Sequence, residues 1–215
     1  MSSREGRRGF LICLEGIDKS GKTTQASLLA LKLRALGLQV VLSREPTDGR
    51  VGRLIKELLR GRERPPPVLE AVLFALDRYQ HVEEVVRPAL KAGRVVVLDR
   101  YYYSSLAYQG SAGIPLAWLR DLNAFAPRPD LAIYLDVRPE VALARGWGAS
   151  GTVLERPAVQ EAVRRVYLQL VEAGELILVS AERPIEAVAH DVLALAMEAL
   201  EERGLLRKQP YASEL

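Results

Sequence analysis

An apolar segment that runs straight into a glycine-rich turn is the feature that most restricts the fold of this chain. The run Phe10–Leu14 is followed by residues 16–23, Gly-Ile-Asp-Lys-Ser-Gly-Lys-Thr, which fit the pattern GxxxxGK(S/T). A buried strand that leads into such a turn and then into a helix directs several backbone N–H groups, and the positive end of the helix dipole, at one point. We expect the phosphates of a nucleotide to bind at that point.

Two side chains of the turn have specific roles in this hypothesis. Lys22 would reach the β- and γ-phosphates, and the Thr23 hydroxyl would complete the coordination of a Mg²⁺ ion. The alternative is a glycine-rich turn that binds nothing, which the strand and helix context disfavours. The predicted nucleotide-binding residues are Gly16, Ile17, Asp18, Lys19, Ser20, Gly21, Lys22, Thr23 and Thr24.

The composition is that of a globular protein and excludes several classes. Hydrophobic residues make up 49% of the 215 residues and charged residues 27%, so the chain is not disordered as a whole. The longest apolar runs have the length of strands, which argues against a membrane span. The net charge is +3, but the basic residues are spread along the chain, which favours anionic small molecules over nucleic acid as partners.

Histidine and cysteine usage narrows the chemistry further. Two histidines, His81 and His190, and one cysteine cannot form a zinc site with the usual ligand spacing. We expect both histidines on helix surfaces. Cys13 cannot form an internal disulfide and suits a small buried position in the first strand. Together with the lack of a recognisable signal sequence, this predicts a cytoplasmic protein.

Strand-like and helical segments alternate along the chain. This alternation predicts an α/β fold, a single domain with a five-stranded parallel sheet and helices on both faces. We expect a basic tail at 1–9, the domain at 10–202 and a loosely held tail at 203–215. The predicted strands are 10–15, 39–43, 94–99, 130–136 and 175–179. The predicted helices are 22–36, 50–60, 67–92, 103–125 in two pieces, 138–146, 157–173 and 183–202.

Charged residues follow the second and third predicted strands. Arg44 follows the second strand, and Asp99 and Arg100 end the third. Ligands of open parallel sheets bind beyond the carboxyl ends of the strands, so these side chains should face one cleft. Two guanidinium groups would grip an acceptor phosphate, and Asp99 would hold Mg²⁺ through its water shell. A surface salt bridge is the alternative for either arginine alone.

Four segments, together with the glycine-rich turn, resemble the thymidylate kinases, a family of P-loop nucleoside monophosphate kinases. The glycine-rich turn is shared by many ATP and GTP enzymes, whereas the second and third of these segments are more specific. The segments are Ser43-Arg44-Glu45-Pro46, Leu73 to His81, Asp99 to Gly110, and Pro129-Asp130-Leu131 through Arg145.

The resemblance implies an acceptor site for dTMP. Arg44 and Arg100 would bind its phosphate, Phe74 would stack on the thymine ring and Arg78 would hydrogen-bond the base. Phe74 and Arg78 are spaced i, i+4, so they share one helix face and can reach one ligand. Ordinary core packing remains the alternative for Phe74.

The resemblance assigns further residues near the nucleoside. Ser104 and Ser105 would lie near the base edge, and Tyr108 would pack beneath the sugar, where core packing is again an alternative. Asp18 would touch the sugar 3′-hydroxyl or a phosphate-bound water.

The expected lid over ATP departs from the pattern of many bacterial relatives. The segment at about 145–156 has no basic residue between its terminal arginines, although its glycines suit a moving lid. Members with a charge-poor lid resemble one another in carrying an arginine at the position of Lys19. We therefore hypothesise that Lys19 is the transition-state cation and that Arg145 assists it. Glu155 would order the lid near the acceptor, or act only as a charge at a helix N-terminus.

The resemblance implies phosphoryl transfer from ATP to dTMP with Mg²⁺, by a homodimer. The catalytic set would be Lys22, Lys19, Arg100, Arg44, Asp99 and Arg145. The nearest alternative is a kinase for another nucleoside monophosphate or a deoxynucleoside on the same scaffold. A P-loop ATPase or GTPase switch is a second alternative, but the guanine-reading NKxD pattern is absent and the Asp99-Arg100 pair offers no DxxG switch.

Overall fold

The computed structural model describes residues 8–61, 65–146 and 156–206. Its centre is a five-stranded sheet in the order β2-β3-β1-β4-β5, with every neighbouring pair parallel. This confirms the predicted sheet, and the predicted strand ends lie within two residues of the observed ones. The strands are β1 (Phe10–Glu15), β2 (Val40–Arg44), β3 (Val95–Asp99), β4 (Leu131–Asp136) and β5 (Ile177–Ser180).

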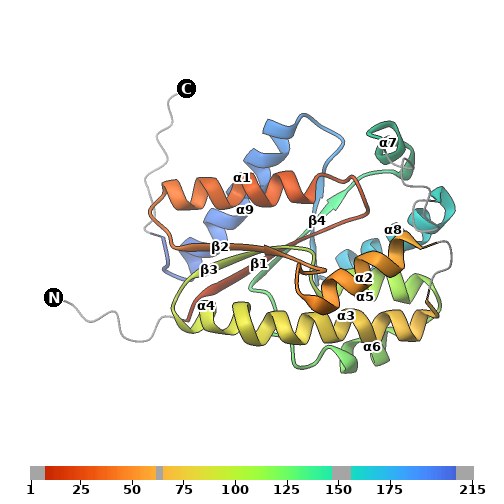
Figure 1. Ribbon diagram of the computed structural model, residues 1–215. Coiled ribbons are helices and arrows are strands. Elements are labelled where there is room, and N and C mark those ends of the chain that lie inside the picture. Colours follow the sequence, from red (N-terminus) through yellow and green to blue (C-terminus); the bar gives the residue numbers. More distant parts are fainter. Residues whose placement is uncertain (1–7, 62–64, 147–155, 207–215) are drawn as a thin grey trace.

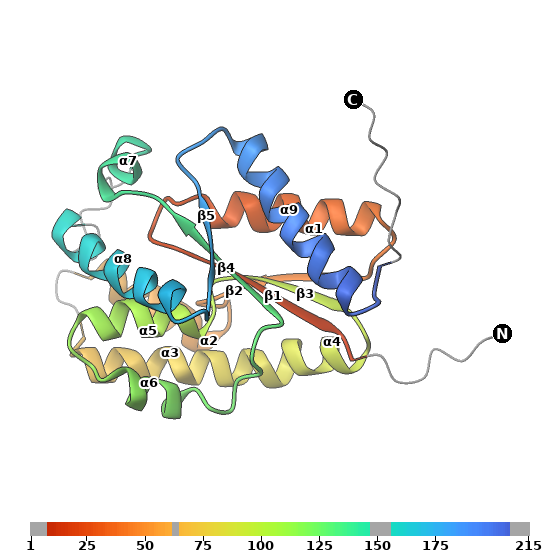
Figure 2. The ribbon, with the colours of Figure 1, turned by 180° about the vertical axis from the view of Figure 1, so that it is seen from behind.

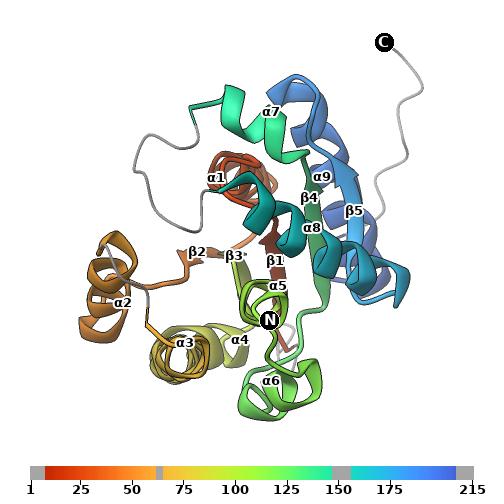
Figure 3. The same cartoon turned by 90° about the vertical axis from the view of Figure 1, so that its right-hand side faces the viewer.

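Helices cover both faces of the sheet. Figures 1 and 2 show α1 and α9 on one face and the long α3 to α4 segment with α5 on the other, and Figure 3 shows the same layers from the side. No helix in the described ranges is long and apolar enough to cross a membrane. The helices are α1 (Lys22–Ala35), α2 (Arg50–Arg60), α3 (Pro67–His81), η1 (Val82–Val86), α4 (Arg87–Lys91), α5 (Tyr102–Ser111), α6 (Leu116–Leu122), α7 (Pro139–Ala144), α8 (Pro157–Glu172) and α9 (Ile185–Glu202).

The strand register brings the functional ends of three strands to one edge. Asp99 pairs with Leu14 of β1 on one side and with Arg44 of β2 on the other. The β1 and β3 side chains are buried throughout, as expected of strands covered on both faces. The glycine-rich turn, the β2 end and the β3 end therefore lie next to one another.

The segment 67–92 is not one uniform helix. A π-helical stretch, η1, separates α3 from α4 and ends at Val86, two residues before Pro88. A proline has no backbone N–H, so the hydrogen-bond ladder must change in its vicinity. At the C-terminal end of α1, Gly37 follows the C-cap residue and has φ +83°. This left-handed conformation is one that glycine adopts without strain, and it commonly ends a helix.

The position of one histidine was predicted wrongly. His190 is exposed on α9, as expected, but His81 is buried at the end of α3. Helical periodicity could not reveal this burial, because the covering residues, Ser43 and Glu45, come from β2 and the residue that follows it.

Candidate active site

The glycine-rich turn has positive φ angles and close backbone contacts that require glycine at two of its positions. Gly16 has φ +151°, and a Cβ there would lie 2.5 Å from Ser20 Oγ and 2.7 Å from the Leu135 carbonyl oxygen. Gly21, directly before α1, has φ +96°. Lys19 has φ +61°, an unusual value for a residue with a side chain. Backbone strain of this kind is typical of ligand-binding loops.

Lys22 is buried within this turn. Its Nζ donates to the Ile17 carbonyl oxygen at 2.6 Å and lies 3.2 Å from Ser20 Oγ. Burial lowers the pKa of Lys22 to about 7, and the nearby positive charge of Arg100 acts in the same direction. An anionic phosphate would supply the countercharge that this ammonium group lacks.

Thr23 and Asp99 are the oxygen donors predicted to hold the metal, and the structure brings them together. The Thr23 hydroxyl donates to Asp99 Oδ2 at 2.5 Å. Mg²⁺ usually takes only one or two protein oxygens, with waters and phosphates completing its shell. The pair fits that preference, and the described ranges hold no cluster of three or more His, Cys, Asp or Glu residues suited to a metal.

Arg100 is the centre of the polar contacts around the turn. It has φ +71°, and its guanidinium group donates to the Gly16 carbonyl oxygen at 3.0 Å and to Asp18 Oδ1 at 2.5 Å. Further donors point to Ser104 Oγ at 3.1 Å and to the Tyr108 hydroxyl at 3.3 Å. The strand-end arginine, the turn and helix α5 therefore converge as the sequence predicted.

Tyr108 is mostly buried beside this arginine. The Arg100 guanidinium carbon lies 5.2 Å from the centre of its ring, which is within cation–π range. Burial raises the pKa of Tyr108 to about 12. Its hydroxyl therefore stays protonated at neutral pH and can act as a hydrogen-bond donor.

Glu15 is a buried carboxylate that the sequence reasoning missed. Its oxygens accept from the Tyr101 N–H at 2.7 Å, from Ser104 Oγ at 2.6 Å and from the Tyr167 hydroxyl at 2.9 Å. Burial raises the pKa of Glu15, while the hydrogen bonds and Arg100 oppose that rise. A charged residue at the end of an apolar strand, directly before Gly16, was the available signal.

Arg44 lies apart from Arg100, with its side chain largely exposed. Its Nη2 lies 3.2 Å from each carboxylate oxygen of Asp48. Lys56 Nζ also binds Asp48, at 2.6 Å, and Arg53 donates to the Asp48 backbone oxygen at 2.7 Å. The sequence reasoning missed these two residues of α2, although their i, i+3 spacing places them on one helix face.

Arg44, Arg53 and Lys56 form a basic group around Asp48. A cavity of about 500 Å³ is lined by Arg44 and Asp48 of this group. It extends along the end of β2 and reaches the predicted metal-binding pair. The lining residues that matter here are Thr23, Ser43, Arg44, Asp48, His81 and Asp99.

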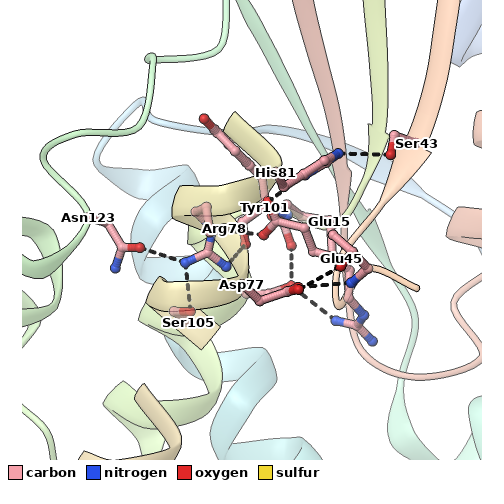
Figure 4. A network of polar contacts seen from close by, with 12 residues as sticks. Glu15, Ser43, Glu45, Asp77, Arg78, His81, Tyr101, Ser105 and Asn123 are labelled. Carbon is pink, nitrogen blue, oxygen red and sulfur yellow. Dashed lines mark hydrogen bonds and ion pairs between the residues drawn. The ribbon is translucent and has the colours of Figure 1, made fainter. Parts of the chain in front are cut away.

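Arg78 is buried and held by protein groups (Figure 4). Its Nε donates to Glu45 Oε2 at 2.7 Å, and Nη1 donates to Asn123 Oδ1 at 2.6 Å and to Ser105 Oγ at 3.2 Å. Nη2 donates to the Tyr101 carbonyl oxygen at 3.2 Å. Four of its five N–H groups are thus used within the protein, and its contact with a base stays a prediction.

The remaining predicted base-side residues lie on α3 and α5. Phe74 is half-buried, one helical turn before Arg78. Gln109, which the sequence reasoning did not single out, is buried and donates from Nε2 to Glu70 Oε1 at 3.1 Å. Its own Oε1 has no hydrogen-bond partner within the described ranges. Buried acceptors are rarely left without a partner, so Gln109 is a further candidate ligand contact.

The two cations predicted for the transition state lie near each other. Lys19 is exposed, and Arg145 Nη1 lies 3.5 Å from its backbone oxygen. Arg145 Nη2 donates to the Ala181 carbonyl oxygen at 2.7 Å, which fixes the end of α7. Most of the predicted lid, including Glu155, lies outside the described residues.

Comparison with known proteins agrees with this geometry. Residues 14–192 match the family model described as thymidylate kinase. The chain is 46% identical to a probable thymidylate kinase of Pyrococcus abyssi over 202 residues, which cover 90% of this chain and 98% of that protein. It is 42% identical to a probable thymidylate kinase of Thermococcus gammatolerans, covering 89% and 98% of the two chains. A thymidylate kinase of Xylella fastidiosa is 42% identical, with 91% and 90% covered.

Proposed function

The chain belongs to the thymidylate kinase family, and from that premise we propose that it transfers the γ-phosphoryl group of ATP to dTMP, giving ADP and dTDP. The observation that carries this proposal is the meeting of Lys22, Arg100 and the Thr23–Asp99 pair at one sheet edge. A donor phosphate on the turn and an acceptor phosphate on the arginine side would face each other there. A switch protein has no need of the second phosphate site.

The acceptor side is assigned as follows. Arg44 and Arg100 bind the dTMP phosphate, and Asp18 and Tyr108 contact or support the sugar. The contacts of Asp18 and Tyr108 with the Arg100 guanidinium group support the part of this assignment that joins these three residues. Phe74, Arg78, Ser104 and Ser105 form the base side, with Glu155 ordering a lid at about 145–156.

The reaction is an in-line displacement. A phosphate oxygen of dTMP attacks the γ-phosphorus, forming the new O–P bond as the bond to the bridging β–γ oxygen breaks and its electrons leave with ADP. The attacking phosphate is already anionic at neutral pH, so no general base is required. Catalysis then consists of positioning and of charge neutralisation by Lys22, Lys19 and the arginines.

The metal is part of the proposal. Thr23 and Asp99 would hold Mg²⁺, which when bound supplies positive charge to the β- and γ-phosphate oxygens. The short hydrogen bond between their oxygens supports this assignment, because it places both donors at the N-terminus of α1.

Selection of the base rests on a small difference. dTMP and dUMP differ by one methyl group, which an apolar pocket discriminates by about 1–3 kcal/mol. We therefore expect measurable turnover of dUMP.

A coupled assay of ADP release over a panel of nucleoside monophosphates tests the function. ADP should form with ATP, Mg²⁺ and dTMP, more slowly with dUMP, and not when the acceptor is omitted. Release at an equal rate without any acceptor would contradict the kinase. Preference for a different nucleotide would place the chain with another substrate on the same scaffold.

Assembly and location complete the proposal. Helix α3 exposes an apolar face made by Val68, Leu69, Val72, Leu76 and Tyr79. A contiguous apolar face of this kind typically marks an interface, and it supports a homodimer formed through α3. We propose that the enzyme works in the cytoplasm, where its substrates ATP and dTMP are made.

A further inference from the structure

A buried chain of hydrogen bonds runs from the end of β2 to Arg78 (Figure 4). Ser43 Oγ lies 2.8 Å from His81 Nε2, and His81 Nδ1 lies 3.0 Å from Glu45 Oε1. The other oxygen of the same carboxylate, Glu45 Oε2, accepts from Arg78 Nε at 2.7 Å. His81, Glu45 and Arg78 are all buried, so the His81–Glu45 and Glu45–Arg78 contacts are shielded from bulk water, whereas Ser43 is partly exposed.

We propose that His81 is a positioning residue: it fixes the carboxylate of Glu45 and, through it, the guanidinium group of Arg78 that receives the base of the acceptor. The inference rests on the proposed function, because the role of Arg78 toward the base belongs to it. His81 itself touches no reacting group.

The roles of the two ring nitrogens follow from their partners. A carboxylate only accepts hydrogen bonds, so Nδ1 of His81 carries the proton that faces Glu45. In the neutral ring, Nε2 then accepts from the Ser43 hydroxyl. Glu45 therefore selects the tautomer of His81, and the Ser43 hydroxyl, which can donate or accept, pairs with Nε2.

Because the site is buried, the hydrogen bond from His81 determines the orientation of the Glu45 carboxylate. A buried ion pair is favourable only when its geometry is good and the remaining lone pairs are satisfied. Arg78 occupies one oxygen of Glu45 and His81 occupies the other, so the carboxylate plane cannot rotate without losing a bond. The Glu45 backbone N–H is also fixed, donating to the Asp99 carbonyl oxygen at 3.1 Å.

The orientation of Arg78 follows from this arrangement. With Nε held by Glu45, the two ends of the guanidinium group meet Ser105, Asn123 and the Tyr101 carbonyl oxygen. The hydrogen bonds among the described residues leave the fifth N–H, on Nη2, for a ligand. Loss of the His81 contact frees Glu45 to turn, and the direction of that N–H is then no longer fixed.

Two substitutions of His81 separate its two contacts. In His81→Asn the amide nitrogen can take the place of Nδ1 and still donate to Glu45, but it cannot reach Ser43. In His81→Gln the amide reaches the place of Nε2 and Ser43, and the contact to Glu45 is lost. His190→Gln is the matched control, because His190 is the other histidine and lies exposed on α9.

Steady-state kinetics with dTMP at saturating ATP·Mg²⁺ give the first readout. We expect His81→Gln to raise the KM for dTMP about tenfold with kcat changed less than about threefold, since misplacement of a binding group weakens ground-state binding. His81→Asn should restore the KM to within about threefold of wild type. Equal effects of the two variants, or an unchanged KM in His81→Gln, would overturn the proposal.

A second readout does not depend on turnover. Nitrogen-15 NMR of the imidazole groups, assigned with the His190→Gln variant, should show His81 as the Nδ1-protonated tautomer in the wild-type protein. The Nε2-protonated tautomer would overturn the proposal even in an active enzyme. If wild-type protein lacks activity on dTMP while the tautomer is as expected, the proposed substrate fails and the His81–Glu45 contact stands.

Discussion

At the scale of single residues, the chemistry of this site is concentrated in charges that the fold keeps from water. Lys22 is buried with two neutral oxygen partners, and Arg100 lies close enough to disfavour a second positive charge. Burying an ammonium group in this way costs stability in the ligand-free protein. Bound phosphates offset that cost. The burial that lowers the stability of the ligand-free protein therefore raises its affinity for an anion.

Proton uptake on nucleotide binding follows from the lowered pKa of Lys22. In the free protein Lys22 loses its proton as pH rises through about 7, and binding of a polyphosphate restores the charged form. Uptake should therefore grow from about 0.1 proton at pH 6 to about 0.9 at pH 8, and affinity for ATP·Mg²⁺ should fall above neutral pH. Calorimetry in two buffers with different ionisation enthalpies measures this uptake.

Two variants serve as controls for this experiment. Lys22→Arg stays charged at both pH values, so the uptake should disappear while a cation is kept. Lys32→Met removes an exposed lysine of the same helix and should leave the uptake unchanged. Equal uptake at pH 6 and pH 8 in wild-type protein would contradict the lowered pKa.

Lys19 is expected to act on the transition state. Its side chain is exposed on the turn, Arg145 reaches the Lys19 backbone oxygen, and the sequence has no basic residue between Arg145 and Arg156. Replacing Lys19 by alanine should lower kcat about tenfold or more and leave the KM for dTMP within about twofold, as for a contact made only in the transition state. Steady-state kinetics with both substrates varied check this.

The left-handed backbone of Lys19 calls for a second variant. At φ +61° lysine and alanine both have a Cβ and carry the same strain of about 1–2 kcal/mol, whereas glycine carries none. Lys19→Gly should therefore lose as much kcat as Lys19→Ala. If the glycine variant, which also lacks the charge, kept the wild-type kcat, the missing charge could not explain the alanine result.

At the scale of elements, the approach of α2 to the loop after β2 places the basic group around Asp48. Gly52 makes this approach possible, because a Cβ at that position would lie 2.1 Å from the Thr47 carbonyl oxygen. Thr47 cannot move away freely: its N–H and hydroxyl bind the buried Asp77 at 2.8 and 2.6 Å. The helix and the loop therefore fit only with glycine at the contact.

Gly52→Ala should destabilise the protein although alanine is the better helix former by about 1 kcal/mol. The clash is with backbone, so α2 must shift, and we expect a loss of about 1–3 kcal/mol in the free energy of unfolding together with a raised KM for dTMP. Gly110→Ala, on α5, meets only the end of the Leu116 side chain and should change stability by less than about 1 kcal/mol. Denaturant unfolding of both variants makes the comparison; equal losses would contradict it.

The pattern of elements was predictable because it depends on local information. The alternation of apolar and helical segments predicts the succession of strands and helices along the chain. The rule that ligands bind beyond the carboxyl ends of parallel strands predicts that the glycine-rich turn, Asp99 and Arg100 lie close together, and the structure places them in contact. The π-helical stretch before Pro88 was not predicted in detail, because proline indicates a disturbance but not the form it takes.

At the scale of the whole molecule, two of the missed features, Glu15 and the burial of His81, have one physical cause in common. Glu15 and His81 acquire partners from elements far away in sequence: Tyr167 in α8 and the residue that follows β2. Burial of a polar side chain depends on such long-range packing, and periodicity within one helix or strand carries no record of it. A charged residue inside an apolar segment, as at Glu15, is the one local hint.

The exposed apolar face of α3 is likewise a property of the whole molecule, and it leads to a test of the assembly. Leu76 lies near its middle and is half exposed. If two copies pack through this face, Leu76→Glu places a charge in an apolar interface and should convert a dimer into a monomer. Light scattering after size-exclusion chromatography distinguishes the 23.8 kDa chain from twice that mass. Leu31→Glu, at an even more exposed position on α1, should leave the dimer intact. A monomeric wild-type protein at micromolar concentration, or a dimer that survives Leu76→Glu, would show that α3 does not form the interface.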